Sequence, residues 1–141
     1  MEQTLAILKP DCLQNRNAGK VLDMILEAGF KIRALRMTRM TQSVAESFYA
    51  EHQGKDFFPG LINYITEAPI IVAVLEKENA IMEWRERMGK TNPEEAAEGT
   101  VRKRFAENVR RNVVHGSDSS ENARREIFFF FTETNLLQSC E

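Results

Sequence analysis

Ile70-Ile71-Val72-Ala73-Val74-Leu75 is the stretch around which the rest of the sequence is organised. An unbroken apolar run of this length, rich in β-branched side chains, is typical of a central strand that is covered on both faces. Pro69 directly precedes the run and ends the helical segment before it. We therefore expect a sheet whose middle is formed by this strand.

Three further segments have the pattern of strands. Thr4–Lys9 alternates between two faces, and Lys9 continues the apolar face at the end that Pro10 closes, because proline cannot donate a ladder hydrogen bond. Residues 30–40 are extended but mixed, which suits a strand with basic residues toward solvent. Asn112–His115 is short and β-branched. The sequence thus predicts four strands.

Apolar residues at helical spacing predict the helices between these strands. One helix starts near Ala18 and ends at Gly29, and another runs from Ala80 to Gly89. Capping boxes are expected at Ser43 and Glu46 and at Asp118 and Glu121, each ahead of a helix. The apolar stripes of the remaining helices are Phe48, Tyr49 and His52; Leu61, Ile62 and Ile65; and Ala123, Ile127, Phe130 and Phe131. Residues 90–100 are expected to form a long loop, and the residues after Thr132 a tail.

The order of these elements indicates the fold. Strand, helix, strand, two short helices, strand, helix, loop, strand and helix fit an α+β fold of the split βαβ, ferredoxin-like type. We expect a four-stranded antiparallel sheet with helices packed on it. The length of 141 residues fits a single domain, residues 1–141.

Charge and composition limit the classes of partner. The formal net charge of −2 argues against a dedicated nucleic-acid binder. Local clusters of Lys and Arg in residues 31–39, 102–104 and 110–111 suit a small anion better. The apolar runs are too short to span a bilayer and the start has no basic n-region, so we expect a cytoplasmic protein without membrane contact. Cys12 and Cys140 lack metal-ligand spacing, and no role is assigned to them.

His115 is the first candidate for chemistry. It ends a short predicted strand and directly precedes Gly116, Ser117 and a predicted helix. A glycine permits close backbone approach, and free backbone donors at a helix start favour an anion nearby. A lone histidine is more often structural than catalytic, so the residues alone leave both interpretations open.

Other polar residues lie where they can complete a site around that histidine. Glu126 borders an apolar helix stripe and can hold an imidazole in one tautomer, or it is a solvated helix residue. Lys9 places a cation at a strand end, or it is simply exposed there. Side chains must bind any phosphate, because the sequence has no glycine-rich phosphate loop. The candidates on nearby segments are Tyr49, Arg85, Thr91 and Arg102.

Several motifs together resemble one known family. Asn112-Val113-Val114-His115-Gly116-Ser117-Asp118-Ser119 closely resembles the active-site signature of nucleoside diphosphate kinases, and Thr4–Asp11 resembles their first strand. The resemblance covers roughly residues 3–131. Its other motifs, in family order, are Phe48-Tyr49, Phe57-Phe58, Gly89-Lys90-Thr91-Asn92-Pro93, Gly99-Thr100-Val101-Arg102 and Arg125-Glu126-Ile127.

The resemblance implies a reaction. It implies ping-pong transfer of the γ-phosphate from a nucleoside triphosphate, mainly ATP, to a nucleoside diphosphate through a phosphohistidine. It also implies a homo-oligomer, a tetramer or hexamer, and the cofactor Mg²⁺ held mainly by the nucleotide phosphates rather than by protein ligands.

The resemblance also implies roles for individual residues. His115 would be the nucleophile, with Glu126 and Ser117 supporting it, and Tyr49 and Lys9 would lie beside the transferred phosphate. The implied nucleotide-binding residues are Arg85, Thr91 and Arg102 for the phosphates, Lys9 and Asn112 for the ribose, and Phe57, Leu61 and Val109 for the base. Since stacking and phosphate contacts are common to all nucleotides, we expect many bases and both sugars to be accepted.

The sequence departs from the family pattern at Glu98, where a proline is usual, at Arg104, where an acidic residue is common, and at Lys55-Asp56, where Arg-Pro is usual. Two other hypotheses remain. One is a ferredoxin-like nucleotide or RNA binding module without catalysis. The sequence lacks the paired strand aromatics that RNA-binding sheets use, which counts against this hypothesis. The other is a family member that has lost its activity.

Overall fold

A four-stranded antiparallel sheet forms the centre of the computed structural model, which describes residues 1–137. The strands are β1 (Glu2–Leu8), β2 (Lys31–Thr38), β3 (Ile70–Lys77) and β4 (Val114–Gly116). They lie in the order β2-β3-β1-β4, and each neighbouring pair is antiparallel. This order is that of a ferredoxin-like sheet, so the predicted fold class is confirmed.

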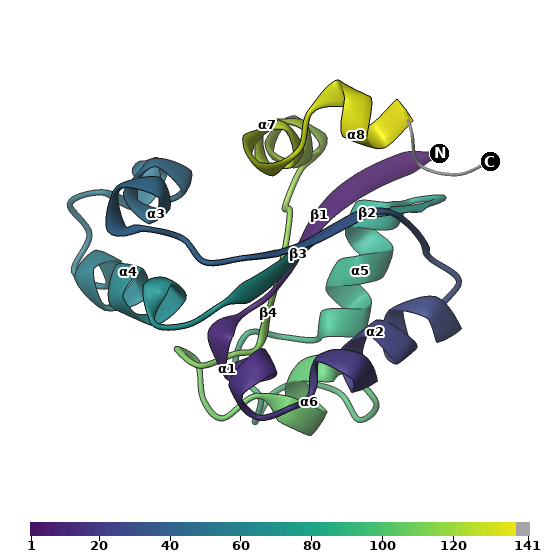
Figure 1. Cartoon of the computed structure of the whole chain (residues 1–141). Coiled ribbons are helices and arrows are strands. Elements are labelled where there is room, and N and C mark those ends of the chain that lie inside the picture. The colour runs from purple at the N-terminus through teal and green to yellow at the C-terminus, as the bar shows by residue number, and fades with distance from the viewer. Residues whose placement is uncertain (138–141) are drawn as a thin grey trace.

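Helices cover both faces of this sheet (Figure 1). One face packs against α3 (Gln42–Phe48), α4 (Phe58–Thr66) and α7 (Ser120–Phe130), and the other against α2 (Ala18–Glu27) and α5 (Ala80–Met88). Side chains of β3 alternate between the two apolar clusters: Ile70, Val72 and Val74 belong to the first, and Ile71, Ala73 and Leu75 to the second. The expectation of a central strand covered on both faces is therefore confirmed.

Three short helices were not predicted, namely α1 (Pro10–Gln14), α6 (Val101–Phe105) and α8 (Glu133–Leu137). The helix predicted to carry Phe48, Tyr49 and His52 is divided into α3 and the 3₁₀ turn η1 (Ala50–His52). Pro10 does end β1, but it also opens α1, because the first position of a helix needs no backbone N–H. The prediction of a tail after Thr132 is wrong as far as residue 137, and Cys140 lies outside the described residues.

Both predicted capping boxes are wrong by one or two positions. The hydroxyl of Thr41, rather than that of Ser43, accepts from the N–H of Val44 at the start of α3. At α7 the cap is Ser119, whose hydroxyl accepts from Asn122 N, while the carboxylate of Asp118 accepts from the Asn122 side chain. In each case the residue with extended backbone angles directly before the helix is the cap.

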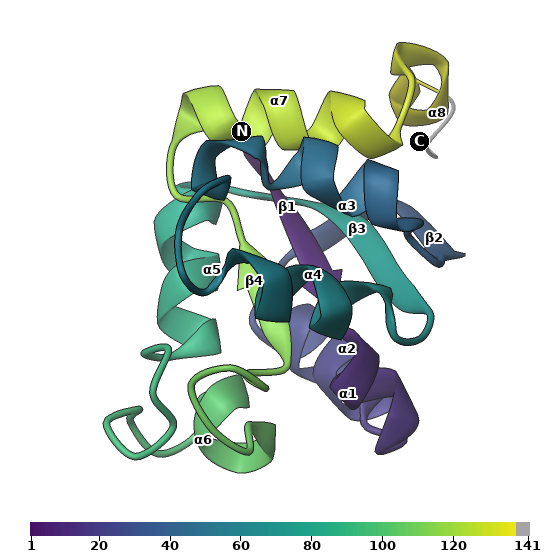
Figure 2. The same ribbon diagram turned by 90° about the vertical axis from the view of Figure 1, so that its left-hand side faces the viewer.

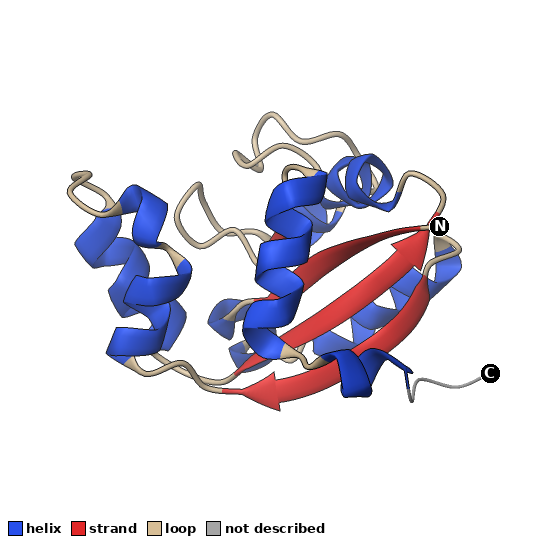
Figure 3. Ribbon diagram, turned by 90° about the horizontal axis from the view of Figure 1, so that it is seen from above, coloured by secondary structure: helices blue, strands red, loops and turns tan. Residues whose placement is uncertain are grey.

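The edge strand β4 positions the candidate site. It pairs only with β1 within the described chain, with Ile7 opposite His115. Figure 2 shows β4 between α5 and the pair formed by α3 and α4, and Figure 3 shows α7 crossing over the sheet. His115 on β4 accordingly contacts Phe48 of α3, Trp84 of α5 and Glu126 of α7. Every helix within residues 1–137 falls short of the length and hydrophobicity needed to cross a membrane.

Candidate active site

His115 is held on several sides and keeps one edge open. Its backbone carbonyl accepts from Nε1 of Trp84 at 3.1 Å, and its ring meets that of Phe48 edge-on with 5.9 Å between centroids. The side chain is 19% exposed. A ring that is fixed in this way, yet reachable, can act on a bound ligand.

Glu126 sets the tautomer of that ring. Nε2 of His115 lies 2.9 Å from Oε1 of Glu126, and the Ser117 hydroxyl donates to the same oxygen at 2.7 Å. Burial alone would raise the pKa of Glu126, but the hydrogen bonds from His115 and Ser117 outweigh burial and lower that pKa. Because the carboxylate only accepts, Nε2 carries the proton and Nδ1 keeps its lone pair. The predicted orienting contact between Glu126 and His115 is present.

Ser117 anchors this arrangement to the sheet. Its side chain is fully buried, and its hydroxyl accepts from the backbone N–H of Leu5 on β1 at 3.2 Å. The hydroxyl therefore joins Glu126 to a central strand, which restricts the position of the carboxylate.

The backbone just before β4 is strained. Val113 has φ of 75°, which is a rare conformation for a β-branched residue. The N–H of Val114 donates to the carbonyl of Asn112 at 2.8 Å, so the three residues form a tight γ-turn. The carbonyl of Val113 accepts from Lys9 N at 2.8 Å. Such strain costs about 1–3 kcal/mol and persists only where the surroundings hold it, most often at functional sites.

Arg102 stabilises this strained backbone. Its guanidinium donates to three backbone carbonyls, those of Gly89 (3.0 Å), Asn112 (3.2 Å) and Val114 (2.9 Å). Burial, and then the nearby charge of Arg85, lower the pKa of Arg102 to about 10. The sequence predicted only a phosphate contact for this arginine. The structure adds a second role, which is to fix the backbone around Val113. This role could not be predicted, because backbone carbonyl acceptors leave no signature in a sequence.

Gly116 allows a close approach of α5 to β4. A Cβ at this position would lie 2.6 Å from Cδ1 of Trp84 and 2.8 Å from Cε of Met88. Any larger residue would have to displace the ring of Trp84 and the end of the Met88 side chain. The close approach that a glycine permits is thus an approach of α5 to β4.

Two small cavities meet at His115. One, of about 300 Å³, is lined by Arg85, Thr91, Arg102 and His115. The other, of about 250 Å³, is lined by Tyr49, Arg85, His115 and Glu126. Within the described chain the buried hydroxyl of Tyr49 has no hydrogen-bond partner, and burial and then the charge of Glu126 raise its pKa. Tyr49 therefore stays protonated and can donate to a ligand.

A larger cavity of about 720 Å³ shares Thr91 with the first of these cavities and His52 with the second, and it is lined by the predicted base and ribose residues. Nζ of Lys9 donates to Oδ1 of Asn112 at 2.8 Å. Burial, and then the charge of Arg102, lower the pKa of Lys9 to about 7, with Asp11 opposing them. Lys9 is 7% exposed, so the alternative of an exposed strand-end lysine is wrong. The predicted residues in its wall are Lys9, Phe57, Leu61, Thr91, Val109 and Asn112.

His52 and Arg110 also line this cavity, and the sequence assigned neither to the site. His52 was expected on a helix stripe, but it lies in η1 after α3 has ended, with its ring 5.3 Å from that of Phe57. The sequence marked Arg110 only as part of a basic cluster with Arg111. Only its neighbour Val109, which the family resemblance identified, indicated that this segment approaches the base.

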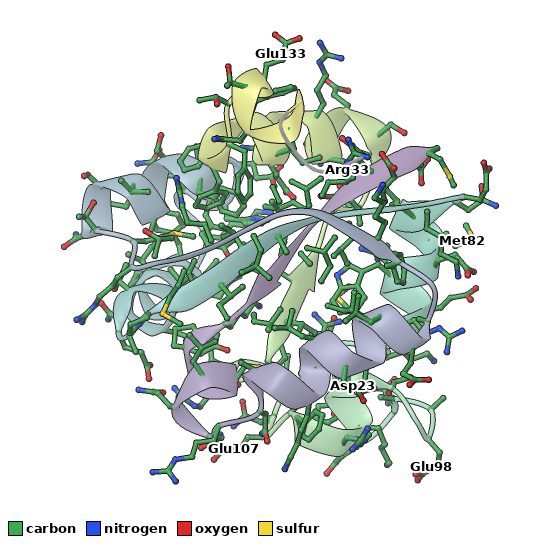
Figure 4. The ribbon with its side chains drawn as sticks, turned by 45° about the vertical axis from the view of Figure 1, so that its right-hand side comes forward. Asp23, Arg33, Met82, Glu98, Glu107 and Glu133 are labelled. Atoms are coloured by element: carbon green, nitrogen blue, oxygen red, sulfur yellow. The ribbon has the colours of Figure 1, made fainter. Side chains whose placement is uncertain are left out.

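The departures from the family pattern lie mostly outside the cavities. Glu98 is exposed and points outward from the loop between α5 and α6 (Figure 4). Arg104 lies over the ring of Phe105 at 4.8 Å. Lys55 lies closer to the site than these two residues, because its ammonium is 5.8 Å from the ring centre of Phe57, which lines the larger cavity. Of these changes, Lys55 is the one that contacts a predicted nucleotide-binding residue.

No group of three or more His, Cys, Asp and Glu side chains in residues 1–137 could hold a metal ion. The cavity at His115 instead gathers the cations Arg85, Lys90 and Arg102, which suit phosphate oxygens. This donor set fits a magnesium ion only if the phosphates of a nucleotide carry it.

Comparisons with known proteins agree with this geometry. The family model described as nucleoside diphosphate kinase matches residues 2–136. A nucleoside diphosphate kinase of Histophilus somni is 51% identical over 136 residues, which cover 96% of each chain. The Aquifex aeolicus enzyme has a TM-score of 0.94 and 40% identity, covering 96% of this chain and 98% of its own. A Halobacterium salinarum enzyme in complex with CDP has a TM-score of 0.93 and 32% identity, covering 99% and 93%. The chain therefore belongs to the nucleoside diphosphate kinase family.

Proposed function

We propose that this phosphotransferase works by a ping-pong mechanism in which Nδ1 of His115 carries the phosphoryl group between nucleotides. The observation that carries the proposal is the 2.9 Å contact between Nε2 of His115 and Glu126. It assigns the proton to Nε2 and leaves Nδ1 as the nucleophilic atom.

In the first half-reaction the lone pair of Nδ1 attacks the γ-phosphorus of a nucleoside triphosphate, mainly ATP. The N–P bond forms as the bond from phosphorus to the β,γ-bridging oxygen breaks, and that oxygen leaves with the electron pair on the diphosphate. The ring gains positive charge, which Glu126 stabilises. In the second half-reaction a β-phosphate oxygen of another diphosphate attacks the phosphoryl group, and Nδ1 regains its lone pair.

The side chains in the two small cavities would neutralise and orient the phosphates. Arg85, Thr91 and Arg102 line one cavity, and Tyr49 offers an unpartnered hydroxyl from the other. Positioning and charge neutralisation are the main contributions that a protein makes to phosphoryl transfer. Mg²⁺ bound to the phosphates would add further charge neutralisation.

The larger cavity would hold the nucleoside. Phe57, Leu61 and Val109 offer apolar contact for a base, and the Lys9–Asn112 pair offers polar groups for the ribose. The Halobacterium enzyme has been seen with CDP, which supports nucleotides as the partners of this chain as well. The RNA-binding alternative has no comparable support.

Exchange between unlike nucleotides tests the reaction. Incubation with ATP, Mg²⁺ and CDP should yield ADP and CTP, and initial rates at varied concentrations of both substrates should give parallel double-reciprocal lines. Intersecting lines would contradict the phosphoenzyme route, and absence of CTP would contradict the function.

Several wider predictions belong to the same proposal. We propose that residues 1–141 act as one catalytic domain, that the protein is cytoplasmic, and that it assembles into a homo-tetramer or homo-hexamer. Light scattering of the purified protein distinguishes the two assemblies from each other and from a monomer.

A further inference from the structure

Arg110 lies in the wall of the larger cavity, beside the residues expected to hold the base. It follows Val109 in the segment between α6 and β4, and it shares the cavity with Phe57 and Leu61. Its guanidinium packs directly on Gly60 of α4, where any Cβ would overlap it. The absence of a side chain at Gly60 therefore leaves the room that the Arg110 guanidinium occupies at the cavity wall.

The charge of Arg110 has no partner within residues 1–137. No carboxylate, carbonyl or ring meets its guanidinium, although its backbone N–H donates to Asn108. The next residue, Arg111, differs completely, because it pairs with both carboxylate oxygens of Glu67 at 3.0 and 3.1 Å. All the side-chain donors of Arg110 are therefore free for a ligand.

Interactions within the fold do not account for the position of this cation. Gly60 belongs to the first turn of α4, and a helix N-terminus is electrostatically unfavourable for a positive charge. The neighbouring cavity residues Phe57, Leu61 and Val109 offer no polar side-chain atom. A ligand in the cavity would supply the acceptors that the protein lacks.

The shape of the guanidinium selects among bases. Its parallel N–H groups match two acceptors side by side, as guanine presents with O6 and N7, whereas adenine places a donor beside N7. We propose that Arg110 makes this chain prefer guanine nucleotides over adenine nucleotides by donating to O6 and N7. This inference rests on the proposed function for the location of the base, and it modifies the expectation that all bases are treated alike.

Equilibrium binding of diphosphates, measured by calorimetry without a triphosphate, tests the proposal. For the wild type we expect GDP to bind about five-fold more tightly than ADP. This factor is at the low end of the discrimination that a bidentate arginine–guanine pair provides, because the site is open to solvent. IDP, which keeps O6 and N7, should bind like GDP, and 7-deaza-GDP, which lacks N7, should bind more weakly. Arg110→Met should remove the preference and leave ADP binding unchanged.

A matched control is Arg87→Met, which removes an exposed arginine from α5 outside the three cavities. It should keep the preference for GDP. Equal binding of GDP and ADP by the wild type would overturn the proposal, as would an equal loss for both in Arg110→Met, which would indicate a phosphate contact. Weak binding of IDP would assign the preference to the 2-amino group and also overturn it. Because binding needs no phosphoryl transfer, failure of the proposed function would appear separately, as absence of nucleotide exchange.

Discussion

Replacing Glu126 with glutamine keeps the shape of the side chain and removes its negative charge. One oxygen of Glu126 accepts from both His115 and Ser117, at 2.9 and 2.7 Å, and the residue is 5% exposed. In the proposed reaction the imidazole becomes positively charged as Nδ1 attacks. The carboxylate therefore interacts more strongly with the transition state than with the free enzyme, and an amide cannot do this.

The size of the effect follows from the contact that changes. A hydrogen bond to a charged group contributes about 1.5–3 kcal/mol, and about 1.4 kcal/mol corresponds to a factor of ten in rate. We therefore expect Glu126→Gln to slow phosphorylation of the enzyme by about 10- to 100-fold. The contacts to the nucleoside should change little, because Glu126 does not line the larger cavity.

Rapid-quench measurement of labelled phosphoenzyme in a single turnover gives this rate directly. Thermal melting checks that the variant is folded. Because the folded-state pKa of Glu126 lies below the unfolded value of about 4.5, the charge stabilises the wild type above that pH. This advantage should shrink as the pH falls through the lowered folded pKa. Wild-type phosphorylation rates in Glu126→Gln would refute the reasoning.

Three further predictions concern the surroundings of the site. Nucleotide phosphates should raise the depressed pKa of Lys9, so nucleotide binding at pH 8 should be accompanied by proton uptake. Calorimetry in two buffers of different ionisation enthalpy measures this uptake, which should be absent in Lys9→Met. Ser117→Ala leaves the N–H of Leu5 without its acceptor and should lower the free energy of unfolding, measured with denaturant, by about 2–4 kcal/mol. The control Thr4→Val removes a buried unpartnered hydroxyl and should leave that free energy unchanged or raise it. Gly116→Ala should cost about 1–3 kcal/mol in the same assay and lower activity, since the new methyl group meets α5.

Much of the fold could be predicted because apolar patterning extends over whole elements. The run Ile70–Leu75 defined the central strand, and the spacing of apolar residues defined α2, α5 and α7. The helices α1 and α6 have five residues each, which is too short for a periodic stripe. The caps were misplaced because adjacent residues such as Asp118 and Ser119 are both good caps, and backbone angles decide between them.

The candidate site could be assembled from sequence only as far as side-chain motifs allow. The resemblance brought His115, Glu126 and the base-binding residues together, and the structure places them around connected cavities. The sequence could not predict the hydrogen bond between Lys9 and Asn112, which are 103 positions apart. Nor could it predict the three backbone carbonyls that accept from Arg102. Backbone acceptors and burial leave no residue pattern. Arg110 was noticed only as part of a basic cluster with Arg111, and the fold shows that it lines the larger cavity.

The site of phosphorylation tests the central claim most directly. Wild-type protein incubated with γ-labelled ATP and Mg²⁺ should acquire a label that is stable in base and lost in acid. ³¹P NMR of the phosphoprotein should assign it to Nδ1 of a histidine, and His115→Ala should remain unlabelled. A label on Nε2, a label that persists in His115→Ala, or an unlabelled wild type would contradict the account.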